Sequence, residues 1–233
     1  QGVIEDFQLL FYIIQPPTPE RVKYDIFDRV NRGGTPLNKQ EMRNALYRGR
    51  CTRMLDKLCC SPEFLIATGR SINKERMKDQ YVVLRAMAFL MLHRGEFKDI
   101  PALQYRGDID DFLARFMVYV NDNAPEKLIV DYENLFIRCM QISYDLLGEN
   151  GFRFSGNGIR RPINMPLFEA LSYLFSFVPE KIDYTWASRL ILDIESVKEE
   201  FDDSRYFSGN IDSTTSVSFR FDRMDKIRNR IQL

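Results

Sequence analysis

The chain has 233 residues, of which 45% are hydrophobic and 28% charged, values typical of a globular protein with one or two domains. Its 33 basic and 33 acidic side chains leave a formal net charge of zero. This balance excludes a whole-chain basic field for nucleic acid, although it leaves room for a local basic surface. The single histidine, His93, argues against most His-dependent chemistry, such as catalytic triads with His, His-rich metal sites and HNH-type nucleases, and we expect it at a cap or on the surface.

Cysteine and acidic patterns argue against a disulfide framework and against a metal site. The four cysteines form no CxxC pair, which indicates a reducing, cytoplasmic compartment: Cys51, Cys59, Cys60 and Cys139. Asp108, Asp110 and Asp111 lack the spacing of a calcium loop, so Asp108 is predicted as a helix N-cap and no metal is expected. No apolar run approaches the roughly 18 residues that suggest a membrane span, so no membrane partner is expected.

The N-terminal region combines one predicted strand with one predicted helix. The apolar run at 7–14 ends at two prolines and favours a buried β-strand. Because a lone strand cannot satisfy its own backbone groups, we expect its sheet to lie upstream of Gln1. Thr18 and Pro19 begin a helix that stops at Gly33 and Gly34.

The next helix has the clearest start chemistry in the chain. Asn38 is the predicted N-cap, and Glu41 lies three residues later, as in a capping box. Leu37 and Met42 occupy the positions of a hydrophobic staple, and Gly49 ends the helix.

After this helix, almost all of the sequence has helical periodicity. Helices are predicted at 51–58, from 61, and at 73–94, 108–121, 125–147, 164–178, 183–201 and 213–231, with a Gly- and Arg-rich loop at 151–162. The predicted fold class is mainly α: a multi-helix, bundle-like domain of about eight or nine helices with one orphan N-terminal β-strand.

The stretch 26–49 reads IFDRVNRGGTPLNKQEMRNALYRG and resembles the hallmark segment in the N-terminal domain of GmrSD-type, modification-dependent restriction enzymes. The matching residues are Phe27, Arg29, Val30, Asn31, Gly33, Gly34, Pro36, Leu37, Gln40, Glu41, Arg43, Asn44 and Ala45. A looser similarity continues at Phe152-Arg153, Asn164, Leu167-Phe168-Glu169 and Arg220.

The resemblance implies a ParB/sulfiredoxin-type nucleotide-binding domain followed by a helical domain. Residues 1–50 are then the end of the nucleotide-binding domain and 51–233 the helical domain. The family's Asp-Gly-Gln-Gln-Arg motif and its His-rich nuclease domain are both missing, so the chain resembles the C-terminal, mostly helical half. The expected function is that of a fragment of a bacterial anti-phage or restriction-type defence protein, not active alone, that regulates recognition or cleavage of modified or foreign DNA.

Within this resemblance, one lip of an NTP site is predicted around the two glycines. Glycines allow close backbone approach, a helix N-terminus carries partial positive charge, and arginines donate to phosphate. The predicted nucleotide-binding residues are Arg29, Asn31, Arg32, Gly33, Gly34 and Arg43. ATP or GTP would bind together with the missing upstream half, and the other expected partners are DNA and a nuclease domain or subunit. The alternative is a non-enzymatic helical protein–protein interaction module in which the glycines only build a turn.

Two basic stretches are candidate DNA contacts. Arg160 and Arg161 lie in the Gly-rich loop, and Arg220 and Arg223 lie in the last helix. The alternatives are a surface connection for the loop, with a structural Arg153, and a solvated, dipole-stabilised face for the helix.

Overall fold

The computed structural model describes residues 13, 15, 22, 25–27, 29, 36–156, 159–179, 181, 183–202 and 206–230. The chain divides into two compact units, 1–37 and 38–233. In the first unit, residues 22, 25–27 and 29 are helical, and Ile13, from the predicted strand 7–14, is the only residue of that stretch described; the strand as such lies outside the described residues. The second unit begins at Asn38, so the helix that follows Asn38 lies in the second unit.

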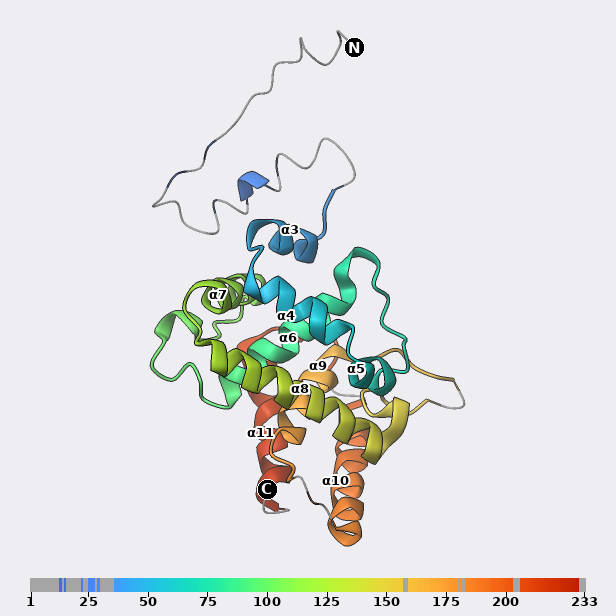
Figure 1. Cartoon of the computed structure of the whole chain (residues 1–233). Coiled ribbons are helices and arrows are strands. Elements are labelled where there is room, and N and C mark those ends of the chain that lie inside the picture. The colour runs from blue at the N-terminus through green and yellow to red at the C-terminus, as the bar shows by residue number, and fades with distance from the viewer. Residues whose placement is uncertain are drawn as a thin grey trace. The chain divides into compact units, whose positions relative to one another are not determined.

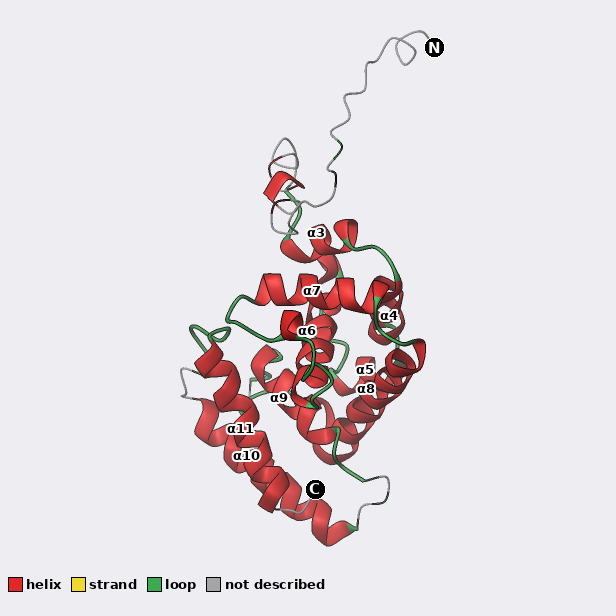
Figure 2. Ribbon diagram, turned by 90° about the vertical axis from the view of Figure 1, so that its left-hand side faces the viewer, coloured by secondary structure: helices red, strands yellow, loops and turns green. Residues whose placement is uncertain are grey.

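The described part of the second unit is all helical, as predicted (Figures 1 and 2). Its α-helices are α3 (Lys39–Leu46), α4 (Arg50–Cys59), α5 (Pro62–Ala67), α6 (Lys78–His93), α7 (Ile109–Asp122), α8 (Glu126–Leu147), α9 (Met165–Phe175), α10 (Tyr184–Asp202) and α11 (Thr214–Arg230). Short 3₁₀ turns lie at Glu75–Met77, Pro101–Leu103 and Gly148–Asn150. Within the described residues no helix is long and apolar enough to cross a membrane.

Side-chain caps set the starts of several helices. Asn38, Ser61, Asp108 and Asn164 each accept a backbone N–H of the first helical turn. At α3 the full capping box forms between Asn38 and Glu41. These local signals explain why most predicted helix starts agree with the structure to within one or two residues.

Helix α6 is the centre of the unit. It contacts α3, α4, α7, α8 and α9, and every residue from 82 to 91 is buried. A helix buried on all sides has no polar stripe, and apart from Arg85 this stretch is apolar around the whole circumference. Helices α10 and α11 lie side by side at one end of the unit (Figures 1 and 2).

The start of α6 differs from the prediction of one helix over 73–94. Arg76 and Met77 have φ values of +56° and +59°, the left-handed region, which non-glycine residues rarely adopt. The regular helix therefore begins only at Lys78.

His93 lies against the core rather than serving as a cap or surface residue. Its ring stacks on Phe221 with centroids 3.5 Å apart and meets Tyr173 edge-on. Its Nε2 is buried without a hydrogen-bond partner among the described residues, and burial lowers the pKa of His93 to about 3. The imidazole is therefore neutral in the folded protein at physiological pH.

Candidate functional site

The N-terminus of α3 is closed by its own capping residues. Asn38 Oδ1 accepts the backbone N–H groups of Gln40 and Glu41 at 2.8 and 2.9 Å. The backbone N–H of Asn38 donates to Glu41 Oε2 at 2.7 Å. Two of the donors that a helix start offers to a phosphate are thus already used.

The same two residues hold the left-handed turn at Arg76. Asn38 Nδ2 donates to the carbonyl oxygen of Arg76 at 2.7 Å, and Arg76 Nη2 lies 3.0 Å from Glu41 Oε2. The hydrogen bond from Arg76, followed by that from the Asn38 backbone, holds the pKa of Glu41 below its ordinary value. Because left-handed non-glycine residues cost about 1–3 kcal/mol each, they persist only where such contacts support them.

Arg43, a predicted nucleotide contact, is fully buried. Its Nε donates to Gln40 Oε1 at 3.0 Å, its Nη1 donates to Asp110 Oδ1 at 2.8 Å, and its guanidinium lies 5.3 Å from the ring centroid of Tyr81. Lys39 pairs with the same carboxylate. Although burial favours the neutral acid, these hydrogen bonds hold the pKa of Asp110 below its ordinary value, so the carboxylate is charged and is shared by two cations.

A pocket of about 530 Å³ opens beside these groups. Its lining includes four cationic side chains, two acidic ones and an aromatic ring: Lys39, Arg43, Arg76, Lys78, Glu75, Asp110 and Tyr81. Lys78 is exposed, and no described residue forms an ion pair with its ammonium group. Arg43 pairs with Asp110 and Arg76 pairs with Glu41, whereas Lys78 forms no ion pair with a described residue and Glu75 opposes its charge.

The remaining predicted nucleotide-binding residues are not brought together by the described structure. Arg29 is helical and exposed, and it belongs to the first unit. Asn31, Arg32, Gly33 and Gly34 lie outside the described residues. Sequence reasoning does not identify a site at the pocket residues Arg76, Lys78, Tyr81 and Asp110. The segments that form the pocket lie 30 to 70 positions apart in the chain, and no local sequence pattern connects them.

Arg220 does not lie where a DNA backbone reaches, which corrects its interpretation as a surface contact. It is fully buried, and its Nη2 pairs with Glu169 Oε2 at 3.0 Å while its Nη1 donates to the Ile211 carbonyl at 2.6 Å. Glu169, also fully buried, accepts from Arg85 as well, and Arg85 Nη2 lies 2.6 Å from Asp212 Oδ1. This four-residue ion network ties α6, α9 and α11 together.

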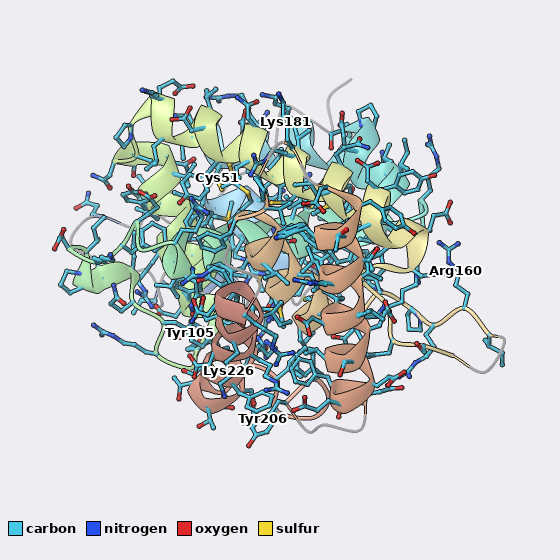
Figure 3. The ribbon with its side chains drawn as sticks, turned by 90° about the horizontal axis from the view of Figure 1, so that it is seen from below. Cys51, Tyr105, Arg160, Lys181, Tyr206 and Lys226 are labelled. Atoms are coloured by element: carbon cyan, nitrogen blue, oxygen red, sulfur yellow. The ribbon has the colours of Figure 1, made fainter. Side chains whose placement is uncertain are left out.

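The other three predicted DNA contacts are partly exposed and paired with acids. Arg160 pairs with Glu149, Arg161 with Asp202, and Arg223 with Glu200. Figure 3 shows Arg160 at the outer edge of the unit, beside the loop that follows α8. Among the described residues, no group of three or more His, Cys, Asp or Glu side chains is placed to hold a metal ion.

Comparison of the chain with protein families, with curated proteins and with solved structures finds no match. The resemblance of 26–49 to the GmrSD-type segment therefore remains a hypothesis that rests on the sequence motif itself.

Proposed function

We propose that this chain supplies the helical domain and one lip of an NTP-binding site in a bacterial antiviral defence protein of the GmrSD type. In that protein, nucleotide binding regulates recognition or cleavage of modified or foreign DNA, and the nuclease resides in another domain or subunit. The motif at 26–49 supports the nucleotide and the family. The chain alone is not expected to turn over nucleotide.

The observation that carries the nucleotide part is the cationic pocket beside α3. Arg43 pairs with Asp110, and Lys78 forms no ion pair with a described residue, so an anion in this pocket would be attracted to Lys78. A triphosphate carries more negative charge than this lip balances. That mismatch is consistent with a lip that needs further groups from the upstream half.

Calorimetric titration with ATP and with GTP tests the proposal, on this chain and on the natural protein including any residues before Gln1. Lys78→Ala removes a lysine–phosphate contact and is expected to weaken binding to the longer protein roughly tenfold, since charged hydrogen bonds contribute about 1.5–3 kcal/mol. The matched control is Lys127→Ala, an exposed lysine on α8 that lines none of the pockets. Equal affinity in both variants would exclude Lys78 from the site.

The second candidate function is a non-enzymatic helical interaction module. The observation that favours it is the mutual pairing around α3: Asn38 caps the helix, Glu41 holds Arg76, and Asp110 holds Arg43. If neither the chain nor the longer protein binds ATP or GTP, this pocket is structural and the helical module is the better account.

A further inference from the structure

A second pocket, independent of the one beside α3, lies between α10 and the residues that follow α8. Its volume is about 610 Å³, within the range of pockets that hold small ligands. Residues 149–150, 153–156 and 159–161 form one wall, and Glu195 and Lys198 of α10 form the other. Four of the lining side chains are cationic: Arg153, Arg160, Arg161 and Lys198.

Three of these four cations have acidic partners. Arg160 lies 2.8 Å from Glu149, Arg161 lies 2.5 Å from Asp202, and Lys198 lies 2.9 Å from Glu195. Lys198 is only 4% exposed, although lysine is rarely this buried unless it is paired. The opposite charges cancel within each of these pairs, so the fourth cation sets the net charge of the pocket.

Arg153 is that fourth cation. It is 4% exposed, and its guanidinium donates only to neutral oxygens: the carbonyls of Glu149 and Thr68 at 3.2 and 3.1 Å, the Arg161 carbonyl, and the Ser71 hydroxyl. No carboxylate of the described residues forms an ion pair with it. Burial, and then the charge of Arg160, lower the pKa of Arg153, although the nearby Glu149 carboxylate, which pairs with Arg160, acts in the opposite direction.

Two glycines leave space for the groups that line this pocket. A Cβ on Gly69 would lie 1.9 Å from Arg160 Nη2, and Gly69 has a φ of +58°. A Cβ on Gly156 would lie 2.2 Å from the carbonyl oxygen of Ile159, so a side chain there would change the path of the wall. The glycines therefore leave room for Arg160 and the 159–161 segment to lie close to the pocket.

We propose that this pocket binds a phosphate group carried by a nucleotide or by a DNA strand. A pocket with three ion pairs and a fourth cation that forms no ion pair with a described residue has an excess of positive charge, which suits a phosphate group. Arg160 and Arg161, partly exposed at the rim, can exchange their carboxylate partners for phosphate oxygens. The proposal does not depend on the NTP site beside α3.

The test is to titrate the full chain with phosphate-containing probes and to measure binding by calorimetry and by NMR of the arginine Nε–H signals. The probes are inorganic phosphate, a nucleoside 5′-monophosphate and a short single-stranded DNA. Arg160→Ala is expected to weaken binding about tenfold, because it removes one charge-assisted contact. Arg106→Ala, another exposed arginine, serves as the matched control and leaves affinity unchanged.

Lys198→Met provides a second variant, with circular dichroism and thermal melting to verify that it folds. Binding of the monophosphate but not of DNA supports the site and identifies a nucleotide as the source of the phosphate. Binding of DNA that competes with the monophosphate supports the site and identifies DNA as the source. An absence of saturable binding, or equal affinity in the Arg160 and Arg106 variants, overturns the proposal. Lys78→Ala leaves this binding unchanged, so failure of the NTP lip and failure of this site are distinguishable.

Discussion

The buried network around Glu169 makes the sharpest prediction about stability. Glu169→Gln preserves side-chain volume and removes one negative charge that lies between Arg85 and Arg220. Removing one partner of a buried ion pair typically costs about 3–5 kcal/mol, because an uncompensated charge stays in the interior. Arg85 retains Asp212, whereas Arg220 retains only the carbonyls of Ile211 and Tyr206.

We therefore expect the lower end of that range, about 3 kcal/mol. For a chain of this size each kcal/mol corresponds to roughly 2–4 °C, so the melting temperature should fall by roughly 6–12 °C. Urea unfolding followed by circular dichroism measures the free energy directly. Glu199→Gln, on an exposed face of α10, is the control and should remain within about 0.5 kcal/mol of the natural chain. If the free energy of unfolding falls equally in the two variants, Glu169 does not compensate the charge of the buried arginines, and the reasoning is refuted.

Three further predictions follow from single residues. Because the pKa of His93 is about 3 in the folded chain and about 6.5 when unfolded, only the unfolded state takes up a proton just below pH 6.5. Stability should then fall by up to about 1.4 kcal/mol per pH unit towards pH 5, and His93→Phe should remove this slope in urea unfolding; an unchanged slope would show that another group causes it. Gly49→Ala places a Cβ 2.6 Å from Asn121 Oδ1, which accepts the Cys51 N–H, and should cost about 1–3 kcal/mol in the same assay; a loss below about 0.5 kcal/mol would mean that Asn121 moves freely. Cys60 is exposed while the other three cysteines are buried, so Ellman's reagent should label one thiol in the native chain and all four after denaturation; fast labelling of a second thiol would contradict the packing.

The helical architecture was predictable because its signals are local. Asn38, Asp108 and Asn164 cap the helices that follow them, and each acts on backbone N–H groups within three residues. The apolar residues of the long segments recur at helical spacing, so the existence of the helices could be predicted from the sequence. Exposure of individual charged side chains could not, since periodicity describes a face and not the partner that covers it.

Arg43, Arg76 and Arg220 illustrate the difference. In the sequence, Arg43 is a basic residue near a glycine turn, Arg76 lies within a predicted helix, and Arg220 lies within a basic helix. Arg43 and Arg220 are predicted to contact ligands. Asp110 lies 67 residues from Arg43, Glu41 lies 35 residues from Arg76, and Glu169 lies 51 residues from Arg220. The helical class, the caps and the motif at 26–49 follow from residue patterns that are local in the chain. Which cations are neutralised in the interior and which remain at a pocket follows from the packing of the helices, because ion pairing depends on distances that the fold sets between residues far apart in the chain.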